Sequence, residues 1–212
     1  MRRYTLADRL IAHADQVLKT LTPGTAPALR ANPANPHPDI GMPDACRRDV
    51  AGLMRVNHSG EVCAQALYHG QALTAKLPAV RREMERAALE EQDHLAWCED
   101  RLRELDSHLS ILNPLWYGLA FGIGAAAGIA GDRWSLGFVA ETEKQVCAHL
   151  DSHLQRVPEN DARTRAILTQ MHTDEADHRQ MALRAGGAEL PPPIRRIMGL
   201  VSKVMTRTSY LV

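Results

Sequence analysis

Two short stretches of this sequence place a glutamate three residues before a histidine. "EEQDH" contains Glu91 and His94, and "DEADH" contains Glu175 and His178. On a helix, residues three apart lie on one face, so each pair could present a carboxylate and an imidazole to the same ligand. One such pair is weak evidence, because the spacing also arises by chance. Two copies with similar acidic neighbours indicate a shared chemical purpose.

Each of these pairs has a single glutamate about thirty residues upstream. Glu61 lies 30 residues before Glu91. Glu143 lies 32 residues before Glu175. A proline between the two members of each set marks a turn between two helices, and the carboxylates lie about 20 to 25 Å from that turn at 1.5 Å per residue. Two antiparallel helix pairs that face each other would therefore gather four glutamates and two histidines at one level.

This set of side chains is typical of a two-metal centre. In di-iron and di-manganese carboxylate bundles, two helices each supply a glutamate and the other two each supply a Glu-x-x-His pair. Carboxylate oxygens and imidazole nitrogens suit iron or manganese, and bound cations offset the cost of burying so many polar groups. The alternative is that these residues lie on solvated helix faces. The predicted metal ligands are Glu61, Glu91, His94, Glu143, Glu175 and His178.

Glu143 has a competitor two residues away, Glu141. The two side chains point about 200° apart on a helix, so only one of them can face the centre. Glu143 shares its face with apolar residues, whereas Glu141 shares its face with Lys144 and Gln145. We therefore predict Glu143 as the ligand.

Two interpretations remain open for the acidic neighbours Glu90, Asp93, Asp174 and Asp177. They could orient the ligand histidines through hydrogen bonds, or they could be ordinary solvated acids. Surface or supporting positions, rather than metal ligation, are expected for the remaining histidines considered, His58, His69, His149, His153 and His172.

The elements that position these residues are predicted to be helices. Ala- and Leu-rich segments with Glu, Arg and Gln favour helix, and no alternating strand pattern is evident. An amphipathic helix is expected at 5–21, followed by a Pro-rich extended linker or mobile loop at 22–44. The core helices are predicted at 49–76, 78–108, 134–156 and 160–185, with a basic amphipathic helix at 194–212.

The expected fold is an all-α, ferritin-like four-helix bundle. Its N-terminal unit, residues 1–45, would hold the first helix and the linker. Residues 46–212 would form the di-iron domain, including an apolar crossover helix and the C-terminal helix. The chain has 212 residues and is 45% hydrophobic, enough for a sizeable core.

Residues 111–131 carry no charge. Their length could span a bilayer, but a proline and five glycines make the segment a weak candidate for insertion. A ferritin-like bundle needs a long crossover between its second and third helices, and this segment fits that role. Its apolarity predicts contact with lipid or an apolar ligand, with Trp116, Tyr117 and Trp134 at the headgroup level. A buried core helix or an oligomer contact is the alternative.

Composition excludes several other classes of protein. Lys plus Arg and Asp plus Glu both total 25, so the basic excess of a nucleic-acid binder is missing. The four cysteines form no C-x-x-C, which argues against a zinc-finger site and favours reduced thiols in a reducing compartment. The N-terminus has no apolar run that predicts a secretory signal.

The stretch "MRVNHSGEVCAQALYHGQ" at 54–71, the two E-x-D-H boxes and the Gly-rich crossover resemble the demethoxyubiquinone hydroxylase family. The resemblance covers about 49–212. It implies that two iron ions are bound by the same six residues that the spacing selects. It also implies hydroxylation, in ubiquinone biosynthesis, of the ring of a polyprenylated demethoxyubiquinone or its quinol. One atom of O₂ would enter the ring and the other would leave as water.

The resemblance also implies partners. Electrons would come from outside, from an NADH-linked reductase or from the quinol itself, because the sequence has no dinucleotide-binding G-x-G-x-x-G in a strand–helix context. A membrane-dissolved substrate implies peripheral association, at the cytoplasmic face of a bacterial inner membrane or, in a eukaryote, at the mitochondrial inner membrane. A homo-oligomer or a complex with other ubiquinone-biosynthesis proteins is also open.

Two competing functions fit the same bundle. One is iron storage or a ferroxidase, which would reduce O₂ without an organic product. The other is a non-catalytic quinone- or lipid-binding protein with structural metals.

Overall fold

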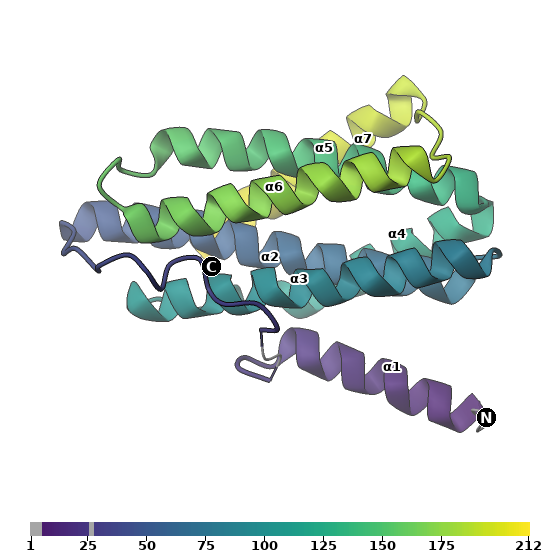
Figure 1. The fold of residues 1–212 in the computed structure, drawn as a ribbon, viewed down its shortest axis with the longest axis horizontal. Helices are drawn as coiled ribbons and strands as arrows, with labels where there is room; N and C mark the ends of the chain where they lie inside the picture. The colour runs from purple at the N-terminus through teal and green to yellow at the C-terminus, as the bar shows by residue number, and fades with distance from the viewer. Residues whose placement is uncertain (1–5, 26–27) are drawn as a thin grey trace.

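The computed structural model describes residues 6–25 and 28–212, and in these ranges the chain forms seven helices and no strand. They are α1 (Leu6–Leu21), α2 (Asp44–Thr74), α3 (Pro78–Glu104), α4 (Asn113–Ala130), α5 (Asp132–Arg156), α6 (Ala162–Arg184) and α7 (Pro192–Leu211) (Figure 1). The predicted all-α, ferritin-like bundle is confirmed. Thr5, where the predicted first helix begins, and Pro27 of the predicted linker lie outside the described residues.

Two antiparallel hairpins, α2–α3 and α5–α6, build the bundle. Figure 1 shows α5 and α6 as a layer above α2 and α3, with all four helices along the long axis. Pro78 opens α3 at a position where its missing amide hydrogen is tolerated. In the turn before it, the carboxylate of Asp132 accepts hydrogen bonds from the backbone N–H groups of Lys76 and Leu77 (3.0 and 2.8 Å). This contact ties the first hairpin to the start of the second.

A buried ion pair joins the hairpins at the opposite end. Arg101 of α3 donates hydrogen bonds to Asp161 (2.9 Å) and to Thr164 (2.8 Å), and Asp161 also accepts from the backbone N–H of Thr164 as the cap of α6. Arg101 and Asp161 are each 1% exposed. Loss of one partner would leave a buried charge unpaired, so this pair holds the relative height of α3 and α6.

Two helix ends differ from the sequence prediction by several residues. α2 begins at Asp44 rather than at 49, because Pro43 is the last residue before it that cannot continue a helix. α3 ends at Glu104 rather than at 108, and Asp106 just beyond it has a left-handed φ of 53°. The other described helix boundaries lie within two residues of the prediction.

α4 is the crossover between the two hairpins, as predicted, and it packs along α2. The two backbones approach closely at glycines. A Cβ on Gly124 would lie 2.3 Å from the carbonyl oxygen of Leu67, and one on Gly70 would lie 2.4 Å from that of Phe121. Part of the unusual composition of this segment is therefore a packing requirement between two helices.

The predicted placement of Trp116 and Tyr117 at an exposed surface is wrong. They are 8% and 6% exposed, because α4 turns this face onto the bundle, whereas Trp134 is 41% exposed. The outward face of α4 carries Leu115 and Leu119. Within the described ranges, none of the helices combines the length and apolar character that crossing a membrane requires.

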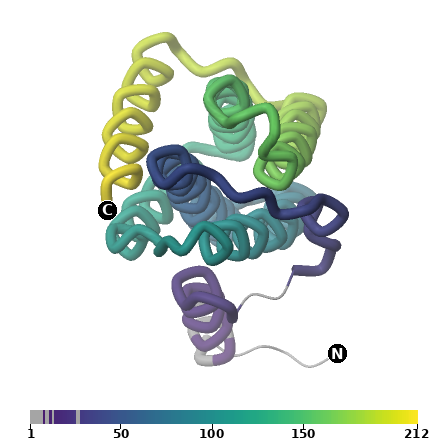
Figure 2. The backbone as a smooth tube through the Cα atoms, turned by 90° about the vertical axis from the view of Figure 1, so that its left-hand side faces the viewer, coloured from purple at the N-terminus to yellow at the C-terminus, as the bar shows by residue number. Residues whose placement is uncertain are grey.

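The sequence predicts an extended or mobile linker between α1 and α2, and its described part after residue 27 is irregular, with a turn at 33–36, and is anchored to the bundle (Figure 1). Ala34 is buried in the core. Asn32 donates a hydrogen bond to Asp100 of α3, and the backbone carbonyl of His37 accepts one from Arg163 of α6 (2.9 Å). Figure 2 shows α1 beneath the bundle and α7 along one side of it. The division into units 1–45 and 46–212 stays a prediction.

Candidate metal centre

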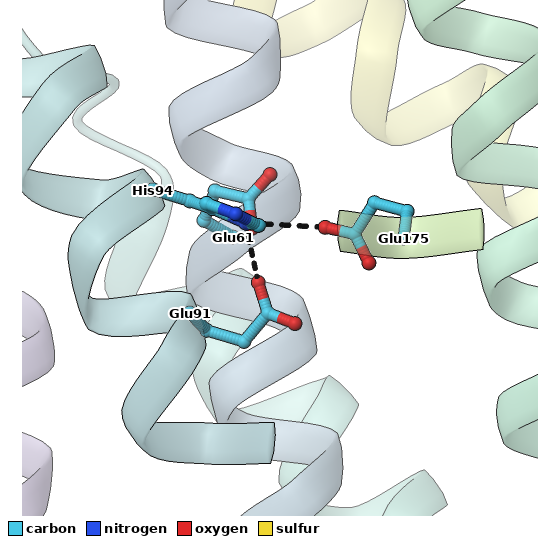
Figure 3. Close-up of side chains that lie close together, drawn as sticks. All are labelled: Glu61, Glu91, His94 and Glu175. Atoms are coloured by element: carbon cyan, nitrogen blue, oxygen red, sulfur yellow. Dashed lines mark hydrogen bonds and ion pairs between the residues drawn. The ribbon is translucent and has the colours of Figure 1, made fainter. Parts of the chain in front are cut away.

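The predicted ligands come from all four bundle helices and are all buried, at most 4% exposed: Glu61 on α2, Glu91 and His94 on α3, Glu143 on α5, and Glu175 and His178 on α6. Four of them form one compact group. Ligand atoms of Glu61, Glu91, His94 and Glu175 lie within 4.8 Å of one another, and Figure 3 shows their side chains converging from three helices.

Glu91 and Glu175 each face both histidines. The Oε2 atom of Glu91 lies 3.0 Å from Nδ1 of His94, and its Oε1 atom lies 3.2 Å from Nδ1 of His178. Glu175 repeats this arrangement, with Oε1 at 3.2 Å from His94 and Oε2 at 3.2 Å from His178. Each carboxylate thus directs one oxygen toward each imidazole, as a carboxylate shared by two cations would.

The other two glutamates lie at the two ends of this arrangement. Oε2 of Glu61 lies 3.5 Å from Nδ1 of His94. Glu143 is outside the compact group, and its charge interacts with that of His178, while its Oε1 atom accepts a hydrogen bond from the hydroxyl of Tyr68 (2.6 Å). The six side chains therefore divide into two half-sites that share Glu91 and Glu175.

Three carboxylate oxygens in the centre are buried without a hydrogen-bond partner among the described residues: Oε2 of Glu61, Oε1 of Glu91 and Oε2 of Glu143. A single imidazole N–H cannot satisfy the several oxygens that approach each Nδ1 atom. Buried polar atoms left unpaired are costly, and two divalent cations would satisfy them. The donor set fits a pair of iron or manganese ions.

The pKa values of the buried carboxyls and of His94 also indicate that positive charge would stabilise this centre. Burial raises the pKa of Glu61 and of Glu143 well above the usual value for a carboxyl. Burial also opposes ionisation of Glu91, but the imidazoles of His178 and His94 beside its two oxygens outweigh burial and lower the pKa of Glu91 well below that value. Although burial disfavours the charged imidazole of His94, hydrogen bonds to Asp174 and the glutamates raise its pKa. Protons would therefore compete with any metal ions bound at this centre.

The Nε2 atom of each predicted ligand histidine contacts an acidic residue on the helix that carries the other histidine. Nε2 of His94 lies 2.8 Å from Oδ2 of Asp174, and Nε2 of His178 lies 2.5 Å from Oε2 of Glu90. These contacts leave both Nδ1 atoms directed into the centre, which is how a carboxylate orients a metal-binding histidine. Of the two interpretations for the acidic neighbours, orientation applies to Glu90 and Asp174, whereas Asp177 is exposed.

Asp93 instead contacts the linker, where Arg30 donates to it. Glu141, the competitor of Glu143, accepts a hydrogen bond from Gln145 and lies near Lys144. Three of the histidines for which surface or supporting positions were expected are buried, and none joins the compact group among the described residues: His58, His69 and His153.

Tyr68 is a residue of the centre that sequence reasoning missed. Its hydroxyl donates a hydrogen bond to Glu143, and its ring lies nearly perpendicular to the imidazole of His178, with 6.3 Å between the ring centroids. A signal was present, because Tyr68 lies seven residues, or two helical turns, after Glu61 and so shares its face of α2.

An apolar cavity of about 340 Å³ reaches the centre between α2, α4, α5 and α7. Glu61 forms part of its wall. Its mouth lies between α4 and α7, where the lining residues Leu119, Ile123, Ile197 and Val201 are at least 40% exposed. A largely apolar molecule could therefore enter from the surface of these two helices and meet one of the predicted ligands.

Comparison with known families agrees with this geometry. The family model described as "Ubiquinone biosynthesis protein COQ7" matches residues 48–209. The chain belongs to the COQ7 family. The resemblance inferred from the motifs is thereby confirmed over nearly the predicted range.

Relatives of this chain that carry the name 3-demethoxyubiquinol 3-hydroxylase include proteins from three bacterial species. The protein from Acinetobacter baumannii is 64% identical over 99% of both chains. The one from Acinetobacter baylyi is 63% identical over 100% of both chains. The one from Pseudomonas putida is 56% identical over 99% of this chain and 97% of the relative. The similarity thus also extends over α1 and the linker, N-terminal to the residues that the family model matches.

Proposed function

We propose that this COQ7-family chain is a di-iron mono-oxygenase that hydroxylates the ring of a polyprenylated demethoxyubiquinol. Its relatives are named for the hydroxylation of demethoxyubiquinol, and the chain belongs to their ubiquinone-biosynthesis family. The chain is therefore a hydroxylating oxidoreductase of ubiquinone biosynthesis with a quinol substrate. The observation that carries the di-iron part is the position of Glu91 and Glu175, each with one oxygen toward each histidine.

The chain's own residues would hold the two metals in the two half-sites. Glu61 and His94 would bind one ion, Glu143 and His178 would bind the other, and the two remaining glutamates, Glu91 and Glu175, would be shared. Iron bound in this way supplies the activation of O₂. Hydroxylation places one oxygen atom on the ring, and the other leaves as water with two electrons and two protons from a donor.

The cavity supplies the site for the substrate. Its apolar walls would hold the quinol ring beside Glu61 and exclude water from the reaction. The polyprenyl tail would extend out of the cavity through its mouth between α4 and α7. A cavity of this kind, apolar with a few polar groups, is the usual form of a small-molecule site.

The surface around the mouth supports peripheral association with a membrane that contains the substrate. Exposed apolar side chains of α4 and α7 lie beside basic residues of α7: Arg195, Arg196, Lys203 and Arg207. Such a surface can lie at the headgroup level of an anionic bilayer. In a bacterium this would be the cytoplasmic face of the inner membrane. The donor would be an NADH-linked reductase or the quinol, and a homo-oligomer or a complex with other biosynthetic proteins stays a prediction.

The test is complementation of a bacterium that lacks its own demethoxyubiquinol hydroxylase. The wild-type chain should restore ubiquinone and remove the accumulated demethoxyubiquinone, measured by mass spectrometry of extracted quinones. Glu91→Ala should restore none. Glu85→Ala, which changes an exposed glutamate on the same helix, should behave as wild type. Restoration by Glu91→Ala would contradict the proposal, as would failure of the well-expressed wild-type chain.

A further inference from the structure

Arg30 approaches the metal centre from outside the bundle. It lies in the linker before α2 and therefore outside residues 48–209, which the family model matches. Its Nε atom donates to Oδ2 of Asp93 on α3 (2.6 Å), and its Nη2 atom lies 2.9 Å from Oδ2 of Asp174 on α6. The guanidinium thus bridges one helix of each hairpin next to the metal-binding motifs.

The contact with Asp174 leads directly to a predicted ligand. The same Oδ2 atom of Asp174 lies 2.8 Å from Nε2 of His94, and the other oxygen accepts a hydrogen bond from Gln170 (2.9 Å). A continuous series of contacts therefore runs from Arg30 through Asp174 to His94. Charge-assisted hydrogen bonds of this type are strong and directional.

Arg30 is itself held in place. The backbone N–H groups of Leu29 and Arg30 both donate to Oδ1 of Asp93 (2.6 and 3.2 Å). The guanidinium lies over the ring of Trp97 at 4.8 Å from its centroid, and the same ring lies 5.4 Å from the imidazole of His94. The linker, the aromatic ring and the two carboxylates together fix the arginine.

In the half-site of His178, Arg86 takes the place that Arg30 has in the half-site of His94, but it is held less firmly. Glu90, which holds His178, has Arg86 of its own helix at 3.8 Å, and the side chain of Arg86 is 58% exposed. The contacts of Arg30 are shorter, and its side chain is 40% exposed. The carboxylates that it meets are 3% and 13% exposed, against 37% for Glu90. The two half-sites therefore differ in how firmly the carboxylate behind the histidine is held.

We propose that Arg30 is a positioning residue for the half-site of His94. By holding Asp174, it fixes the direction of the imidazole so that Nδ1 faces Glu61, Glu91 and Glu175. The proposal rests on the proposed function in so far as two metal ions occupy the centre. It makes the N-terminal linker part of the metal site rather than a separate attachment.

The experiment measures Fe(II) binding to the full-length chain without O₂, in competition with a chromogenic chelator. Wild type should bind two ions. Arg30→Ala should weaken one of the two by about tenfold, the effect expected when a ligand loses its orienting contact, and leave the other unchanged. Arg30→Lys should restore only part of the affinity for that ion, because an ammonium group cannot span both carboxylates as the guanidinium does. Arg103→Ala, on a 68% exposed side chain of α3, is the control and should leave both affinities unchanged.

A second comparison separates positioning from stability. Asp174→Asn should weaken the same ion, and Arg30→Ala should add little in that background, because the arginine acts through Asp174. Mössbauer spectra of the iron-loaded Arg30→Ala protein should change for one of the two iron ions. If Arg30→Ala lowered the unfolding temperature but left both affinities equal to wild type, the positioning role would be overturned and the proposed di-iron function would stand. Wild-type protein that bound fewer than two ions would overturn the di-iron function and, with it, this role.

Discussion

Oδ2 of Asp174 lies 2.8 Å from Nε2 of His94, so the acidic residue of one motif holds the histidine of the other motif. The reciprocal contact joins Glu90 to His178. Each of these acids directly precedes a predicted ligand glutamate in the sequence. The two Glu-x-x-His motifs are therefore not independent ligand pairs, because each helix orients a histidine that its partner supplies.

This crosswise arrangement predicts that Asp174→Asn and Glu90→Gln each weaken metal binding without removing a ligand. A neutral amide cannot match the charge of the carboxylate that accepts the imidazole N–H, so affinity for one iron ion should fall by about 10- to 100-fold. Equilibrium titration with Fe(II) under N₂ measures this. The control is Asp177→Asn, an exposed acid one residue before His178. Equal affinities in all three variants would show that the crosswise contacts do not support the metals.

The choice between Glu143 and Glu141 predicts a difference in metal stoichiometry. Glu143 is 2% exposed and one of its oxygens has no hydrogen-bond partner among the described residues, whereas Glu141 pairs with Gln145 and Lys144. Glu143→Gln should therefore bind about one iron ion per chain, and Glu141→Gln should bind two, because only the first removes a ligand charge. Elemental analysis of reconstituted protein distinguishes them. The reverse result would mean that Glu141, rather than Glu143, is the metal ligand on α5.

The sequence was sufficient for the features that depend on spacing along one helix. The Glu-x-x-His pairs, the choice of Glu143 over Glu141 and the position of the crossover all follow from the period of a helix and the length of a bundle. The helical period determines which side of a helix a residue occupies. It does not determine which residue of another helix that side chain contacts.

The features that the sequence left open or missed depend on contacts between elements. Whether Asp93 or Asp174 holds a histidine depends on the rotation and height of α3 against α6, which local spacing leaves open. The approach of Arg30 depends on the path of an irregular linker that has no period to follow. The burial of Trp116 depends on the close approach of α4 to α2, which Gly70 and Gly124 permit.

The contact between α4 and α2 predicts opposite effects at two glycines of α4. Gly124→Ala would place a methyl group 2.3 Å from the carbonyl oxygen of Leu67, so the helices must separate and the free energy of unfolding should fall by about 1–3 kcal/mol. Gly122→Ala meets nothing within 4 Å and should raise that free energy by about 0.5–1 kcal/mol, because alanine favours helix. Urea unfolding of both variants measures the two changes. Equal effects would contradict the close packing.

His153 predicts a pH dependence of stability away from the metal centre. Burial, and then the neighbouring His149 and Arg156, lower its pKa from 6.5 to about 3. Between these values the unfolded chain binds a proton that the folded chain does not, so the free energy of unfolding falls as pH falls below about 6.5. The slope from this group approaches about 1.4 kcal/mol per pH unit.

His153→Gln removes this titration, so its stability should fall less steeply than that of wild type between pH 7 and 5.5. Urea unfolding at several pH values in this range gives the two slopes. All other groups are common to both proteins, and the difference between the slopes therefore reports on His153. Parallel curves would mean that His153 takes up a proton as readily in the folded chain as in the unfolded one.

The most direct test of the account is the fate of heavy oxygen gas. Iron-loaded, reduced protein should be incubated with a demethoxyubiquinol analogue and ¹⁸O₂, and the extracted quinone should be weighed by mass spectrometry. Wild-type protein should form a product with one heavy oxygen on the ring, and Glu175→Ala should form none. Oxygen consumed with oxidised iron and an unlabelled quinone would contradict this prediction and would favour a ferroxidase instead.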